Sequence, residues 1–232
     1  MQDRPTGNWV ALAGVIAYLL EFAVFIPAGA QLFVPEGSDV VAHYAARTTG
    51  FAVAAALLAV LLMGRVAFIV GLRAALPAAL AIRPLIDLAL AAMVVSVALE
   101  VGALGLAAGT ARLASSGADE AAVVGAYGAI AGLYVGVFPT FGLSVLAASS
   151  AMLWSRAFRL WLPAAGLISG AVMMASGVAD AVLYAESGSQ EGTIGPLGWL
   201  GAVVWMLATG VILVQRWRAS LAHQSMSETA SH

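Results

Sequence analysis

Long apolar runs separated by short polar connections dominate this 232-residue chain. A helical run needs about 20 residues to cross a bilayer. Six runs reach that length, and they predict transmembrane helices at Trp9–Phe33, Thr48–Leu72, Pro84–Ala108, Ala121–Leu153, Trp161–Tyr184 and Pro196–Val214. We therefore expect an all-α, polytopic bundle of six helices over residues 1–214. A polar, mobile cytoplasmic tail is expected over residues 215–232.

The arginines indicate how these helices are oriented. Most of them fall at the N-terminus, in the second and fourth connections and in the tail: Arg4, Arg73, Arg83, Arg156, Arg159, Arg216 and Arg218. Cytoplasmic segments of membrane proteins carry an excess of arginine and lysine. Both termini are therefore expected in the cytoplasm, in a multi-pass protein of the cell (plasma or inner) membrane.

Composition excludes several classes of function. The chain is 62% hydrophobic and 9% charged, whereas soluble domains carry about a quarter charged residues. A net charge of −2 without an arginine cluster argues against nucleic-acid binding. Cysteine and lysine are absent, and the three histidines lie outside the predicted spans. We therefore expect no thiolate metal site, no Schiff base and no haem, and more generally no metal and no cofactor.

Ionisable residues inside the apolar runs are the main clue to function: Glu21, Arg65, Asp87, Glu100 and Asp180. A charge in lipid costs roughly 2.5–3.5 kcal/mol even on insertion scales, so such residues usually serve a function. The four acids outnumber the arginine. Some of these carboxyl groups are therefore expected to be protonated at neutral pH.

Three of the acids are candidates for catalysis. Glu21 falls near the middle of the first predicted helix, and Pro27 after it predicts a kink and a free carbonyl group. Glu100 and Asp180 fall in the outer parts of their helices, where both can approach one outward cavity with Glu21. The alternatives are that Glu21 merely fixes helix packing and that Asp180 reaches interfacial water. Arg65 and Asp87 are interpreted as a structural ion pair, or Arg65 as extending towards the headgroups.

The fourth predicted helix carries two regular patterns. Gly128, Gly132 and Gly136 form a ladder that predicts close packing, including a homodimer through this face. The second pattern is an aromatic stripe, which is interpreted as facing a cavity because a phenol in mid-membrane needs a partner. Its members are Tyr127, Tyr134, Phe138 and Phe141. With residues from other helices, the expected lining of a substrate pocket is Tyr18, Phe25, Tyr134, Phe138 and Tyr184.

Four parts of the chain carry a resemblance to known proteins: the stretch Ala11–Leu20, the Arg83 region, the Phe141-Gly142 step and the segment from Leu162 to Asp180. Together they resemble a broad family of small bacterial six-helix membrane proteins that is described as a domain of unknown function. The resemblance implies a six-helix fold and no particular activity. Glu21 and Glu100 are additions to the family pattern.

A second resemblance, of kind rather than of motif, is to the membrane-embedded terpene cyclases of meroterpenoid pathways. Those proteins are similarly small and helical, lack diphosphate motifs and depend on intramembrane acids, although they have seven helices against the six predicted here. The resemblance implies acid-initiated cyclisation of a hydrophobic isoprenoid substrate. A neutral carboxylic acid can protonate an epoxide or alkene, and aromatic faces can stabilise the resulting cation.

Two other classes of function remain open. The same acids can relay protons in a transporter of small molecules, although the sequence shows no inverted repeat and no matched pair of broken helices. The protein can also be a non-catalytic membrane protein that binds a lipid or a partner helix, with the acids holding helices together.

Overall fold

The computed structural model describes residues 5–35, 38–77, 79–187 and 195–229, with side chains at positions 5–6, 184–187, 195–196 and 220–229 left undescribed. The described residues form nine helices: α1 (Pro5–Ala28), α2 (Val40–Ala45), α3 (Thr48–Leu61), α4 (Met63–Ala75), α5 (Arg83–Ser115), α6 (Glu120–Val135), α7 (Val137–Ser155), α8 (Trp161–Ser187) and α9 (Gly195–Thr229).

Six helical segments are long and apolar enough to cross a membrane, which confirms the six predicted spans. They cover Gly7–Ala28, Thr48–Ala75, Arg83–Ser115, Glu120–Ser155, Trp161–Leu183 and Leu197–Ala219. The second of these comprises α3 and α4, with a turn at Leu62, and the fourth comprises α6 and α7, with a turn at Gly136. Two of the six spans are therefore interrupted partway along their length.

The ends of two predicted elements differ from the structure. The first span was predicted to reach Phe33, but α1 ends at Ala28 because Gly29 adopts φ +60°, which ends the helix. The tail after Val214 was predicted to be mobile, but α9 continues to Thr229. No proline or glycine interrupts residues 215–229, which are rich in helix-forming residues.

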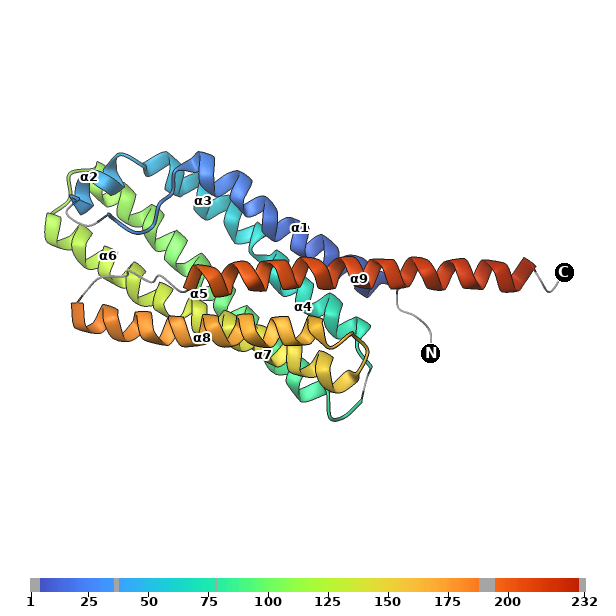
Figure 1. The fold of residues 1–232 in the computed structure, drawn as a ribbon. Helices are drawn as coiled ribbons and strands as arrows, with labels where there is room; N and C mark the ends of the chain where they lie inside the picture. Colours follow the sequence, from blue (N-terminus) through green and yellow to red (C-terminus); the bar gives the residue numbers. More distant parts are fainter. Residues whose placement is uncertain (1–4, 36–37, 78, 188–194, 230–232) are drawn as a thin grey trace.

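Helix α5 contacts α2, α3, α4, α6 and α7, while α9 lies against α1 and α8. In Figure 1 the beginning of α1 and the end of α9 lie at the same end of the bundle, which we call the terminal end. The short helix α2 lies at the opposite end, called the α2 end below (Figure 1).

Glycines bring α1 and α4 into backbone contact. A Cβ atom added to Gly14 would lie 2.5 Å from the carbonyl oxygen of Gly64, and one added to Gly64 would lie 2.7 Å from the nitrogen of Tyr18. Gly71 likewise packs against the backbone of Ala11. Such close approach of two backbones requires glycine. It fixes the height of Tyr18 on α1 relative to Arg65 on α4.

Two glycines of the predicted ladder, Gly132 and Gly136, do not meet another helix backbone in this way among the described residues. Gly132 is exposed, and an added Cβ atom there would meet nothing within 4 Å. An added Cβ atom at Gly136 would lie 2.8 Å from the side chain of Leu99. Pairing of two copies through Gly128, Gly132 and Gly136 stays a prediction.

Candidate functional site

A partly enclosed cavity of about 220 Å³ lies inside the bundle, between α1, the α3–α4 span, α5, the α6–α7 span and α9. Its lining contains two acids, one arginine and a large proportion of aromatic rings. The lining residues are Tyr18, Glu21, Phe22, Phe25, Leu32, Leu58, Arg65, Glu100, Leu104, Tyr134, Val137, Phe138, Phe141 and Trp199.

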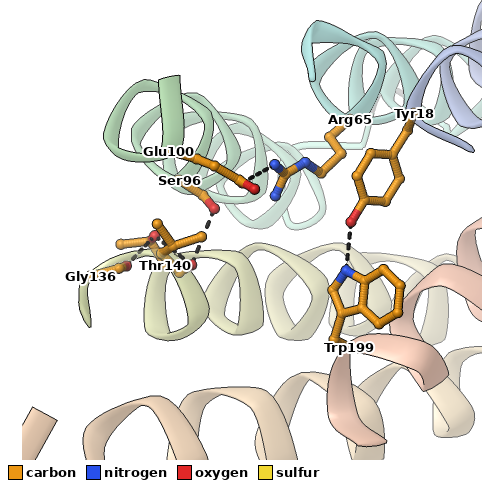
Figure 2. Close-up of polar contacts among 8 residues, drawn as sticks. Tyr18, Arg65, Ser96, Glu100, Gly136, Thr140 and Trp199 are labelled. Carbon is orange, nitrogen blue, oxygen red and sulfur yellow. Dashed lines mark hydrogen bonds and ion pairs between the residues drawn. The ribbon is translucent and has the colours of Figure 1, made fainter. Parts of the chain in front are cut away.

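Arg65 is one of the buried residues of this wall. It belongs to the buried face of α4, and 2% of its side chain is exposed. Its Nη2 atom donates to Oε2 of Glu100 on α5, forming an ion pair across the bundle (Figure 2). The guanidinium carbon lies 4.8 Å from the ring centroid of Tyr18 and 5.0 Å from that of Phe141. One carboxylate and two aromatic faces therefore compensate the buried positive charge.

Arg65 and Asp87 each belong to an ion pair, as expected, but the predicted pairing of Arg65 with Asp87, or its extension to the headgroups, is wrong. Asp87 instead bonds Arg73 at 2.8 Å, near the terminal end. Arg73 lies two helical turns, about 12 Å, beyond Arg65 on α4. Asp87, near the beginning of α5, is therefore too far from Arg65. Arg65 cannot extend to the headgroups because its face of α4 packs inside the protein.

Glu21 faces the same cavity from α1. Its Oε2 atom is buried and has no hydrogen-bond partner among the described residues. The Nε atom of Arg65 is likewise unpartnered within the described part of the chain. The site thus contains a bound carboxylate, Glu100, and a second acid, Glu21, whose Oε2 atom is not hydrogen-bonded by any described residue.

Trp199 connects the last span to the first. Its indole Nε1 atom donates to the hydroxyl oxygen of Tyr18 at 2.6 Å (Figure 2). Its ring also meets Phe22 edge-on, with 5.3 Å between centroids. Trp199 was not identified as a site residue from the sequence. Its position away from the arginine-rich boundary could have set it apart from the tryptophans at that boundary. Arg65 was noticed but assigned to another partner.

The wall formed by the fourth span is bent at Gly136. Pro139 has no N–H group to bond the carbonyl oxygen of Val135, so the helix is interrupted at the cavity. Thr140 Oγ1 donates to the carbonyl oxygen of Gly136 at 2.6 Å, and Ser96 Oγ on α5 donates to that of Val137 at 3.1 Å (Figure 2). These side chains stabilise the bend.

Residues 29–35, called the strap below, follow α1 as a non-helical segment. The strap borders the cavity at the α2 end, where its Leu32 contributes to the lining. Tyr44 on α2 donates its hydroxyl to the carbonyl oxygen of Leu32 at 2.7 Å. Burial raises the pKa of the Tyr44 phenol, which keeps it a neutral donor. The ring nitrogen Nε2 of His43 lies 2.8 Å from the carbonyl oxygen of Gln31. The strap is therefore held to α2 through its backbone.

Most of the residues predicted for the site come together. Glu21 and Glu100 line the cavity with Tyr18, Phe25, Tyr134 and Phe138. Asp180 does not: it lies near the end of its span, half-exposed, and is not part of the lining. The side chain of Tyr184 lies outside the described residues. The expectation of one cavity shared by three acids thus fits two of them.

Comparisons of the chain with protein-family models, curated proteins and solved structures found no match.

The geometry separates the two acids by role. Glu100 is paired with the guanidinium group of Arg65, and a carboxylate can accept a proton. No ion pair of Glu21 is present among the described residues, and an unpaired charge in this apolar surrounding is costly, so the neutral, proton-donating form is favoured. Aromatic faces from α1, α6, α7 and α9 lie around both acids. The arrangement offers a donor and an acceptor of protons, together with surfaces that attract positive charge.

Proposed function

We propose that this protein is an intramembrane acid–base catalyst that cyclises a hydrophobic, isoprenoid-like substrate. The observation that carries the proposal is the convergence of Glu21 and the Arg65–Glu100 pair on one aromatic-lined cavity. Glu21 serves as the acid and Glu100 as the base. Tyr18, Phe25, Tyr134 and Phe138, already expected from the sequence, bind the substrate together with Trp199.

The proposed reaction balances without a cofactor. The Glu21 carboxylic acid protonates an alkene carbon or an epoxide oxygen, leaving a carbocation and a Glu21 carboxylate. A second double bond of the substrate attacks this cation and closes a ring. Glu100 then accepts a proton from the carbon next to the new cation, and the electron pair of that C–H bond forms a double bond. Substrate and product are isomers, and solvent returns the protons between turnovers.

The experiment uses purified protein in liposomes with a C15 isoprenoid alcohol and its terminal epoxide, followed by mass spectrometry. When the reaction is run in H2O, we expect a product with the same mass as the substrate. When it is run in D2O, the product should carry one deuterium atom per alkene protonated. Glu21→Gln should lower the rate by about 10²–10⁴-fold, the usual contribution of general acid catalysis. Glu120→Gln, the same change at an exposed position in the first turn of α6, is the matched control.

Two outcomes would contradict the proposal. One is that wild-type protein leaves both isoprenoids unchanged. The other is that Glu21→Gln and Glu120→Gln convert them at the same rate. Asp180→Asn tests the sequence-based prediction that Asp180 is catalytic. Because Asp180 does not line the cavity, we expect this variant to retain activity.

A proton-coupled transporter of small molecules is a second candidate, favoured by the interruptions at Leu62 and Gly136. Residues on either side of both turns, Leu58 and Arg65 in one span and Tyr134 and Val137 in the other, line the cavity. Broken spans at a central acidic site are common in transporters. This candidate predicts uptake of a substrate into proteoliposomes that depends on a pH gradient, and uptake that is unaffected by the gradient would exclude it.

The proposed orientation places both termini in the cytoplasm, because Arg73, Arg83, Arg156 and Arg159 lie near the terminal end. The chain contains no cysteine, so single cysteines introduced at Ser38 and Ser116 can be labelled without background. We expect an impermeant thiol reagent added to whole cells to modify both positions. Protection of both positions from the reagent would indicate the opposite orientation.

A further inference from the structure

The side chains around Glu21 carry one more acid than base. Arg65 from α4 and Glu100 from α5 compensate each other, and Tyr18 on α1 and Tyr134 on α6 are neutral phenols. Trp199 from α9 adds no titratable group. When Glu21 is ionised, the cavity carries a net charge of −1, and its Oε2 atom has no partner among the described residues.

The remainder of the cavity is suited to a positive charge. Phe22, Phe25, Phe138 and Trp199 are half-buried and form its rim, whereas Tyr18 and Phe141 are buried beneath it. Aromatic faces attract cations, most strongly where water is excluded. The guanidinium group of Arg65 already lies within 5.0 Å of two ring centroids in this cavity. Because Glu100 partners Arg65, the acid available to a second cation is Glu21.

We infer that the cavity binds amphiphilic ammonium compounds, with one positive charge beside Glu21 and an apolar chain extending towards the lipid. The inference rests on the site proposed above and names a class of ligand for it. A cavity of about 220 Å³ is smaller than the 300–1,000 Å³ of typical ligand pockets. It therefore accommodates a trimethylammonium group and a few methylene groups, while the remainder of the chain stays in the bilayer.

A bound ammonium group and a proton on Glu21 exclude each other. Lowering the pH protonates Glu21 and removes the charge that the ligand needs. Binding is therefore expected to weaken as pH falls, by up to tenfold per pH unit where Glu21 titrates. In the reaction, the same surroundings stabilise the carbocation that the ammonium group imitates.

The experiment measures binding of radiolabelled decyltrimethylammonium to the full chain in nanodiscs of zwitterionic lipid, with empty nanodiscs subtracted. We expect saturable binding of one molecule per chain at pH 8, at least tenfold weaker in Glu21→Gln and unchanged in Glu120→Gln. Decanol, a neutral molecule of the same chain length, should not displace the label at equal concentration. Melting temperatures of the variants show that each one is folded.

The inference is overturned if folded wild-type protein shows no saturable binding above empty nanodiscs. It is also overturned if Glu21→Gln binds as tightly as wild type, or if decanol competes equally. These outcomes are distinct from failure of the proposed function. Binding without conversion of isoprenoids would support the ligand class and contradict the cyclase, whereas conversion without ammonium binding would do the reverse.

Discussion

The same two helices, α4 and α5, form two ion pairs in very different surroundings. Arg65 and Glu100 meet inside the bundle with 2% and 12% of their side chains exposed, whereas Arg73 and Asp87 meet near the terminal end with 40% and 45% exposed. The outer pair can exchange its partner for water, and the inner pair cannot. The comparison shows that a mid-membrane pair fixes a site, whereas a boundary pair merely adds to a surface.

The largest effect is expected from Arg65→Met, which leaves Glu100 buried without a cation. Removing one member of a buried pair typically costs about 3–5 kcal/mol. We expect the variant to melt much earlier in detergent and to lose activity. Adding Glu100→Gln should restore most of the stability without restoring activity. If Arg65→Met melted like wild type, the inner pair would not hold the helices together.

A smaller effect is expected from Gly64→Ala, because the crossing of α1 and α4 places Tyr18 beside Arg65. The added methyl group would lie 2.7 Å from the backbone nitrogen of Tyr18, and overpacking of this kind typically costs about 1–3 kcal/mol. Gly132→Ala is the control, since the space around Gly132 is open. Equal melting temperatures for the two variants would show that the crossing tolerates separation.

Exchange of arginine for lysine distinguishes the pairs more finely. At position 65 lysine keeps the charge but loses the planar group that packs against Tyr18 and Phe141. We expect Arg65→Lys to lose about 1 kcal/mol of unfolding free energy and much of the activity, and Arg73→Lys to lose neither. Melting curves and turnover of both variants provide the measurement. If the Arg65→Lys variant were active, the positive charge of Arg65 would be sufficient and its planar group would not be needed.

The smallest effect is expected from Arg73→Met, because exposed ion pairs contribute at most about 1 kcal/mol and are screened by salt. The difference in melting temperature between this variant and wild type should vanish in 0.5 M salt. For Arg65→Met the difference should persist at the same salt concentration. A salt-sensitive inner pair would mean that water reaches Glu100.

Periodicity and composition predicted the parts of the structure that depend on local sequence. Hydropathy defined all six spans, because each must satisfy its own backbone within the lipid. The cost of charge in lipid identified Glu21 and Glu100, and the spacing of the aromatic stripe identified Tyr134 and Phe138 as lining residues. Each of these inferences depends only on the sequence of a single helix.

The features that the sequence did not predict depend on how two helices align. Arg65 was matched to the wrong acid because hydropathy does not tell which turn of α4 faces which turn of α5. The glycine ladder of the fourth span was favoured over the glycines that form the α1–α4 crossing. A signal was present there: Gly7 and Gly14 on one helix, and Gly64 and Gly71 on the other, are spaced by two turns and share a face.

The hydrogen bond between Trp199 and Tyr18 joins the last span to the first, and this has a consequence for biogenesis. During translation Arg65 enters the bilayer before Glu100 does, and at that stage Glu21 is the sole acid in the two spans already inserted. The aromatic lining of the cavity then lacks Trp199 until α9 is inserted. A ribosome stalled before residue 199 would therefore leave a membrane-inserted intermediate with its charges in place and its pocket unfinished.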